Sequence, residues 1–234
     1  MLSTQSFSVI VSDFVSLFFP NYCCACNLAL SKSEEFICTH CRAELSETNM
    51  HKNQPNVLHP QFFEIPGLTY AMAFCWFKKG SVIQKLLHQL KYDGNEELGV
   101  FLGELYGKQL REYQYHEKID IITTVPLHYL KYRKRGYNQS DKIAEGLASS
   151  LELPFLKLIK KEVNRKSQTR KDRLQRFENV ASTFSALRTK ESICGKHILV
   201  VDDVLTTGAT IQSACQPLLE KGAKISILTI AVVK

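Results

Sequence analysis

The sequence predicts an α/β protein whose parallel sheet is covered by helices on both faces. From residue 119 onward, segments with strand-like patterns alternate with segments that have helical spacing. The strand-like segments are nearly continuous apolar runs, which is typical of strands buried on both faces. The alternation also supplies the crossover connections that parallel strands need. The 234 residues allow one large domain, or one domain with a small additional module.

Residues 1–21 are predicted to form an amphipathic helix. The apolar stretch 5–19 has helical spacing, no basic residue before it and no small-residue cleavage site after it, and Asp13 interrupts it. These features favour a helix packed on its own protein over a signal peptide. A helix that contacts a membrane surface or a partner protein is the alternative. No apolar run reaches the roughly 18 residues that a membrane span requires.

Residues 22–45 are predicted to form a small metal module. They contain two C-x-x-C pairs, made by Cys23, Cys26, Cys38 and Cys41. Four thiolates are a ligand set of structural Zn²⁺, and a short ribbon would close the gap between the pairs. Cys24 and His40 are competing ligands beside the pairs. A disulfide framework is the alternative, but no secretion signal is visible and the other cysteines lie alone in apolar segments.

Residues 46–66 are rich in Asn, Pro and Gln without clear periodicity, which predicts a linker. Residues 67–234 are then predicted to form the α/β domain. Its first elements are a strand over 68–77 and helices over 81–92 and 96–112. The later elements are strands over 119–127, 153–159, 196–203 and 224–233, and helices around 139–150 and 208–222.

The stretch VVDDVLTTGAT places two carboxylates and a Thr/Gly turn where a parallel strand gives way to a helix. Backbone amides and hydroxyls over Thr206–Thr210 can surround a phosphate, which the helix macrodipole also favours. Asp202 and Asp203 then suit the vicinal hydroxyls of a sugar, and the hydration shell of Mg²⁺. The stretch therefore predicts a ribose 5-phosphate ligand with further negative charge. An ordinary helix capped by Asp203 or Thr206 is the simpler alternative.

This stretch resembles the phosphoribosyl pyrophosphate (PRPP) signature of type I phosphoribosyltransferases. Together with the paired cysteines, further segments resemble the ComF family of competence proteins over roughly residues 22–234: VPLH (125–128), RGYNQS (135–140), Arg165, Gln168–Thr169, Arg176, Asn179–Val180 and Phe184. Lys171 departs from the family pattern, because that position is usually apolar in similar sequences. The resemblance implies a phosphoribosyltransferase-like fold preceded by a zinc module. It also implies PRPP with Mg²⁺ as ligand, and either transfer of the phosphoribosyl group with release of pyrophosphate or PRPP sensing alone.

The resemblance also implies site residues. The PRPP-binding set would be Asp202, Asp203, Leu205, Thr206, Thr207, Gly208, Ala209, Thr210, Leu127, His128 and Lys131. The catalytic set would be Asp202, Asp203 and Arg176. Arg176 belongs to a basic stretch, residues 165–176, whose length and position favour a lid over a solvated loop.

A second basic cluster, KYRKRGYNQ (131–139), places tyrosines among cations. Single-stranded nucleic acid binding through Lys131, Arg133, Lys134 and Arg135 is one interpretation. A pyrophosphate-binding surface and a plain solvated face are the alternatives. The net charge of +7 fits anionic ligands without selecting one.

Resemblance to ComF proteins implies a role in DNA uptake during natural transformation. It would act in the cytoplasm, with single-stranded DNA and a helicase-like competence protein as partners. The alternative function is a phosphoribosyltransferase of nucleotide metabolism, acting on an unidentified nucleobase or amine acceptor.

Overall fold

The structure, a computed structural model, describes residues 20–162, 184–189 and 192–233. Most of the predicted N-terminal helix and the whole predicted lid, including Arg176, lie outside these residues. Among the described residues, none of the helices combines the length and hydrophobicity that spanning a bilayer would take.

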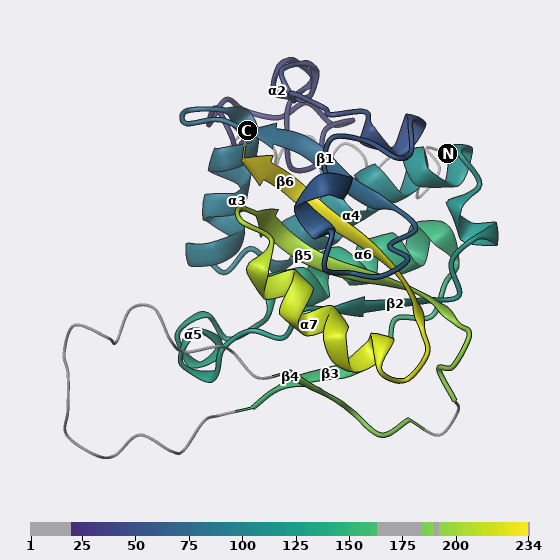
Figure 1. Ribbon diagram of the computed structural model, residues 1–234. Helices are drawn as coiled ribbons and strands as arrows, with labels where there is room; N and C mark the ends of the chain where they lie inside the picture. The colour runs from purple at the N-terminus through teal and green to yellow at the C-terminus, as the bar shows by residue number, and fades with distance from the viewer. Residues whose placement is uncertain (1–19, 163–183, 190–191, 234) are drawn as a thin grey trace, which may run out of the picture.

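Four parallel strands form the central sheet, in the order β1-β6-β5-β2 (Figure 1). They are β1 (Ala71–Phe77), β2 (Ile121–Thr124), β5 (His197–Leu205) and β6 (Lys224–Val233). Each neighbouring pair is parallel. The central strands β5 and β6 are buried over most of their length, which explains their continuous apolar sequence. The predicted parallel sheet is thus confirmed.

Helices cover both faces of this sheet (Figure 1). One face packs on α3 (Val82–Tyr92), α4 (Glu96–Glu112) and α6 (Gln139–Leu151), and the other on α7 (Ala209–Leu219). Alternation along β5 divides the core, since Leu199 and Val201 face the first group and Ile198 and Val200 the second. Gly146 lets α4 and α6 meet closely, because an added Cβ would lie 2.0 Å from the Val100 carbonyl oxygen.

The segment 46–66, predicted to be a linker, is instead packed against the sheet. Its backbone bonds with β1 at Thr48 N–Phe74 O and at Trp76 N–Ser46 O. It contains two short helices, η1 (Met50–Lys52) and η2 (His59–Phe62), whose Met50 and Phe62 are buried. Side-chain hydrogen bonds hold the segment against the sheet; Asn56, for example, donates to the Ala71 carbonyl at 2.7 Å. A periodic apolar face is therefore not needed for this packing. The predicted domain limits themselves stay predictions.

Two further segments differ from their predictions. Within 153–159, only Phe155 pairs with the sheet, through a single parallel bridge to Ile122. The chain then forms β3 (Ile159–Lys161), which pairs antiparallel with β4 (Phe184–Ala186) outside the central sheet. The basic loop after β2 contains helix α5 (Tyr129–Arg135), which has no buried residue. That helix therefore lacks the apolar periodicity by which sequence analysis recognises helices.

Candidate functional site

The acidic pair stands near the carboxyl end of β5, within the strand. Asp202 Oδ1 accepts hydrogen bonds from Ser140 Oγ and from the backbone N–H of Asp203, both at 2.9 Å. Asp203 Oδ2 lies 2.8 Å from Lys91 Nζ, in a pair whose side chains are only 21% and 17% exposed. The two carboxylates therefore have different partners, one from α6 and one from α3.

Burial and the adjacent charge of Asp203 raise the pKa of Asp202 to about 7, although its hydrogen bonds and Lys91 favour the carboxylate. Perturbed carboxyl groups of this kind cluster at functional sites. Near neutral pH the Asp202 carboxyl group is thus only partly ionised. A partly protonated Asp202 repels a nearby phosphate less than a full carboxylate would.

A cavity of about 210 Å³ opens beside the acidic pair. We call it the acidic pocket. It brings together six residues implied by the resemblance: Leu127, His128, Lys131, Asp202, Asp203 and Thr210. It also includes polar side chains that were not assigned to the PRPP site from the sequence: Lys91, Arg135, Asn138, Gln139, Ser140 and Lys161. Arg135, Asn138, Gln139 and Ser140 belong to the RGYNQS segment at 135–140, whereas Lys91 on α3 and Lys161 on β3 reach the pocket only through the fold, because no local motif links them to it.

The Thr/Gly turn enters α7 with Gly208 as its N-cap, in the left-handed region at φ +82°. A Cβ at Gly208 would also lie 2.8 Å from the Phe62 ring, so both backbone and packing require glycine here. The N-cap is therefore neither Asp203 nor Thr206, which argues against the ordinary helix capped by one of those side chains. Thr206, Thr207, Ala209 and Thr210 are exposed around the first turn, where the Ala209 N–H donates to Thr207 Oγ1 at 3.5 Å.

Leu205 differs from the other residues of its implied set. Its side chain is 3% exposed and belongs to the core on the α7 face. This orientation departs from strict strand alternation, which puts Ile198 and Val200 on the α7 face and would put Leu205 with Leu199 and Val201. Any contact that Leu205 makes with a ligand would have to come from its backbone.

The loop between β2 and α6 is anchored by a polar network. Asn138 Nδ2 donates to the Val125 carbonyl at 3.1 Å and to Asp141 Oδ1 at 2.8 Å. Asp141 also accepts from Thr124 Oγ1 at 2.6 Å and pairs with Lys157 Nζ at 2.9 Å. Both ends of the loop are thus tied together at the base of the acidic pocket.

Cations outnumber the two carboxylates around this pocket. Lys91, Lys131, Arg135 and Lys161 all line it. Burial and the charge of Lys131 lower the pKa of Lys161, whereas Asp202 raises it. Such an excess of positive charge suits an anionic ligand. His128 contributes as the N-cap of α5, where its Nδ1 accepts from the Leu130 N–H at 3.3 Å.

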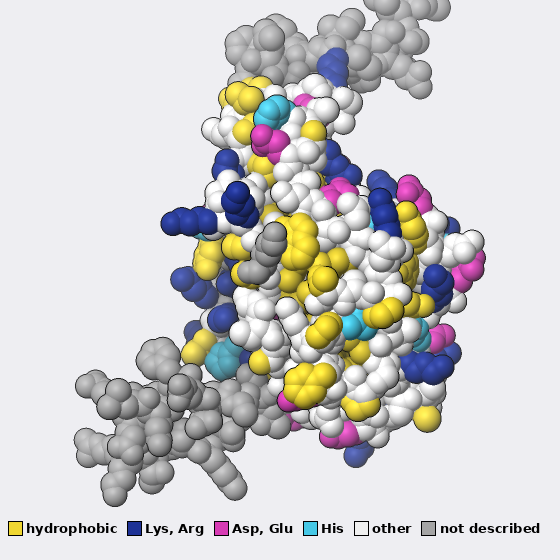
Figure 2. Space-filling model, turned by 45° about the horizontal axis from the view of Figure 1, so that its top comes forward, with side chains coloured by type: hydrophobic (Ala, Val, Ile, Leu, Met, Phe, Trp, Pro, Cys, Tyr) yellow, Lys and Arg dark blue, Asp and Glu magenta, His cyan; other side chains and the backbone are white. Residues whose placement is uncertain are grey.

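The second basic cluster is divided by the fold. Lys131, Arg133 and Lys134 are exposed on α5, beside Tyr129 and Tyr132. Arg135 is only half-exposed, and its guanidinium lies 5.5 Å from the centre of the Tyr92 ring. Tyr137 is buried and donates to the Leu90 carbonyl, so it cannot stack with a nucleobase. Lys and Arg side chains gather on the left of Figure 2, the side where α3 and α5 lie in Figure 1.

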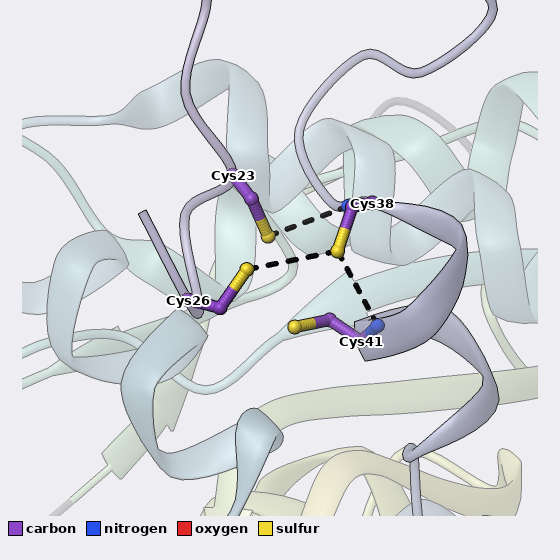
Figure 3. A group of neighbouring side chains, drawn as sticks. All are labelled: Cys23, Cys26, Cys38 and Cys41. Atoms are coloured by element: carbon purple, nitrogen blue, oxygen red, sulfur yellow. Dashed lines mark hydrogen bonds between the residues drawn. The ribbon is translucent and has the colours of Figure 1, made fainter. Parts of the chain in front are cut away.

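The four paired cysteines converge at the other candidate site (Figure 3). The Sγ atoms of Cys23, Cys26, Cys38 and Cys41 all lie within 4.8 Å of one another. They fit one tetrahedral ion, because Zn–S bonds of about 2.3 Å place the sulfurs about 3.8 Å apart. Burial opposes ionisation of Cys23, but backbone N–H bonds from Cys38, Cys26 and Ala25 lower the Cys23 pKa to about 6.

The module is a knuckle followed by a helix, so its second half is not the short ribbon that the gap predicted. Cys38 is the N-cap of α2 (Thr39–Ala43), and its Sγ accepts from the Cys41 N–H at 3.5 Å. Helical spacing then brings both thiols to one side. Cys24 lies outside the four-cysteine group and accepts from Asn95 Nδ2 at 3.6 Å. His40 is exposed and lies 3.8 Å from Glu44.

Comparison with known proteins adds two findings. Residues 138–234 match a family model described as a phosphoribosyl transferase domain. This range includes the acidic pair and the Thr/Gly turn, but neither Lys91 nor the cysteine module.

Among curated proteins, the chain is 29% identical to the DNA utilization protein YhgH of Escherichia coli over 148 residues, 60% of this chain and 63% of that protein. It is 32% identical to Competence protein F of Haemophilus influenzae over 109 residues, 45% of this chain and 46% of that protein. It is 23% identical to Competence protein ComFC of Bacillus subtilis over 220 residues, 88% of each chain. The match therefore spans less than two thirds of the first two relatives.

Proposed function

From the premise that this chain is a relative of the ComF-type competence proteins and carries a phosphoribosyl transferase domain, we propose that it binds PRPP with Mg²⁺ and acts in DNA uptake during natural transformation. One observation carries the PRPP part of this proposal. The acidic pair, the loop after β2 and the first turn of α7 line one cation-rich pocket.

In the proposed complex, each part of PRPP has its own surface. The 5-phosphate lies against Thr206–Thr210, where first-turn amides and hydroxyls donate to its oxygens. The ribose hydroxyls donate to Asp202 and Asp203. The pyrophosphate lies along Leu127–Lys131, with Lys161 beside it. Bound Mg²⁺ supplies further positive charge that neutralises the pyrophosphate.

The reaction that this arrangement supports is displacement of pyrophosphate from the anomeric carbon of the ribose by a nucleophilic acceptor. Negative charge grows on the departing pyrophosphate, where Lys131 and Lys161 stabilise it. Positive charge grows on the sugar, where ionised Asp202 stabilises it. Arg176 remains a proposed catalytic residue outside the described part of the chain. Release of pyrophosphate with candidate acceptors distinguishes an enzyme from a PRPP sensor.

Calorimetric titration with PRPP and Mg²⁺ tests the assignment. The double variant Asp202→Asn, Asp203→Asn should bind roughly ten- to a hundredfold more weakly, because it loses charge-assisted hydrogen bonds worth about 1.5–3 kcal/mol each. Glu112→Gln, a change of an exposed carboxylate on α4, serves as the control and should bind normally. Equal affinities of the double variant and the wild type would reject the assignment.

The α5 surface supports single-stranded DNA as a second ligand. Tyr129 and Tyr132 are 57% and 48% exposed there, beside Lys131, Arg133 and Lys134. Bases stack on such rings while cations contact the backbone. The triple change of Lys131, Arg133 and Lys134 to Gln should weaken oligonucleotide binding and flatten its salt dependence. Fluorescence anisotropy would measure both, with Lys78 and Lys79 changed to Gln as the control, and unchanged binding would remove DNA from this surface.

The cellular role is tested by transformation. A deletion strain should lose transformation and recover it with the wild-type gene, whereas the double aspartate variant should fail to restore it at equal protein level. Normal transformation of the deletion strain would reject the competence role.

The same proposal includes a cytoplasmic location, a helicase-like partner and a packing role for residues 1–21. If the role fails while PRPP binding holds, phosphoribosyl transfer to a nucleobase or amine becomes the favoured function.

A further inference from the structure

We propose that Lys91 binds the pyrophosphate part of the ligand, releasing Asp203 when the ligand arrives. This inference rests on the proposed function and adds a residue from outside the matched domain, residues 138–234. Lys91 lies at the end of α3, lines the acidic pocket and pairs with Asp203 at 2.8 Å.

The packing of α3 does not depend on Lys91. The helix buries Val82, Ile83, Leu86, Leu87 and Leu90, whereas Lys91 keeps 21% of its side chain exposed at the pocket. A lysine side chain has a long flexible stem and three donors. It can therefore exchange a carboxylate for a phosphate oxygen without any change in the helix.

The backbone around Lys91 is fixed on both sides. Gln89 Nε2 donates to the Cys24 carbonyl at 3.0 Å, and Tyr137 Oη donates to the Leu90 carbonyl. Beyond Lys91, Asn95 Nδ2 donates to Cys24 Sγ at 3.6 Å. The cysteine module and the wall of the pocket thus hold the segment 89–95, so that only the lysine side chain needs to move.

The charges in the pocket favour movement of Lys91 from Asp203 to the pyrophosphate when the ligand binds. In this structure Lys91 pairs with the Asp203 carboxylate and neutralises it. When the ribose hydroxyls donate to Asp203 and the pyrophosphate brings several negative charges, the cation gains more from the phosphate oxygens. Lys91 then joins Lys131 and Lys161, the other lysines of the pocket, as a donor to the anion.

Three probes separate this role from simple neutralisation of Asp203: PRPP, inorganic pyrophosphate and ribose 5-phosphate, each titrated with Mg²⁺. Lys91→Met should weaken pyrophosphate and PRPP binding at least tenfold, while ribose 5-phosphate binding changes less than threefold. Lys91→Arg should restore most of the lost pyrophosphate affinity. Lys85→Met, a change of an exposed lysine on the same helix, should leave all three affinities unchanged.

The outcomes are distinct. Equal losses for pyrophosphate and ribose 5-phosphate would overturn the proposal, because Lys91 would then act only through Asp203. Unchanged affinities in Lys91→Met would overturn it as well. If the wild type binds none of the probes, the proposed function fails and the role of Lys91 fails with it. If Lys91→Met does not fold, as judged by its thermal melt, Lys91→Arg decides: retained pyrophosphate binding supports the proposal, and full loss overturns it.

Discussion

The cysteine module and the acidic pocket are built in opposite ways. The four paired cysteines come from one stretch, Cys23–Cys41, and a local knuckle and helix bring them together. The acidic pocket draws Lys91, Ser140 and Lys161 from three separate elements to the end of β5. Residue spacing therefore defines the first site, whereas the second exists only when the whole α/β sheet has formed. Each prediction below tests one side of this contrast.

The largest expected effect is on the cysteine module. Cys38→Ser removes a thiolate of the proposed zinc set, while serine can still cap α2, so the module should unfold through loss of the metal, at a cost of several kcal/mol, since structural zinc binding is coupled to folding. Metal analysis should find one zinc per wild-type chain and little in the variant. Cys194→Ser, outside the group and exposed, is the control. Protein purified without chelator that contains no zinc would contradict the site.

In the acidic pocket, changing a site residue should stabilise the protein, because the ionised form of Asp202 lowers the free energy of unfolding. The pKa of Asp202 is about 7, against an ordinary 3.8, so the folded protein retains a proton between these pH values that the unfolded chain has lost. Stability from this group therefore falls as pH rises from about 4 to 7. The charges that face Asp202 are Asp203, Lys91 and Lys161.

Asp202→Asn cannot ionise, so it should be more stable than the wild type at pH 8, by up to about 4 kcal/mol at roughly 1.4 kcal/mol per pKa unit. The difference should shrink steadily toward pH 4. Denaturant unfolding across this range measures it, with Glu112→Gln as the control. A difference that does not change with pH would show that Asp202 is ionised without cost.

A smaller effect is expected where the pocket loop is anchored. Asp141→Asn weakens the bonds from Thr124 and Asn138 and leaves Lys157 unpaired, which should cost about 1–3 kcal/mol. Pyrophosphate affinity should fall as well, because the loop that carries Lys131 loosens. Glu145→Gln changes another acidic residue of α6, in a half-buried pair with Lys142, and should cost less than about 0.5 kcal/mol because Lys142 keeps its second partner, Glu96. Equal effects of the two variants would mean that the network does not anchor the loop.

Sequence analysis predicted an element correctly where the spacing of its apolar residues reflects which positions are buried. Strands β5 and β6 and helices α3 and α4 were predicted from apolar runs and from helical spacing, because their neighbours bury those positions. Helix α5 and the segment 46–66 have no periodic apolar pattern. Helix α5 is exposed, and the segment 46–66 is held by side-chain hydrogen bonds. In the site, the motif around Asp202 was recognisable. Lys91 was not, because its position at the pocket is set by how α3 lies against the sheet.

The smallest expected effect concerns the one point where local spacing left the cysteine site ambiguous. Cys24 is adjacent to Cys23, yet its thiol lies outside the group of four and accepts from Asn95. Burial, followed by the charge of Cys23, raises the pKa of Cys24, which favours a protonated thiol over a zinc ligand. Cys24→Ser keeps an acceptor for Asn95, so zinc content should stay at one per chain and stability should change by less than about 1 kcal/mol. Cys26→Ser, two residues away, should lose the metal. If both variants lost zinc equally, the metal would depend on Cys24 as well, and residue spacing would not be enough to identify the ligands even at this local site.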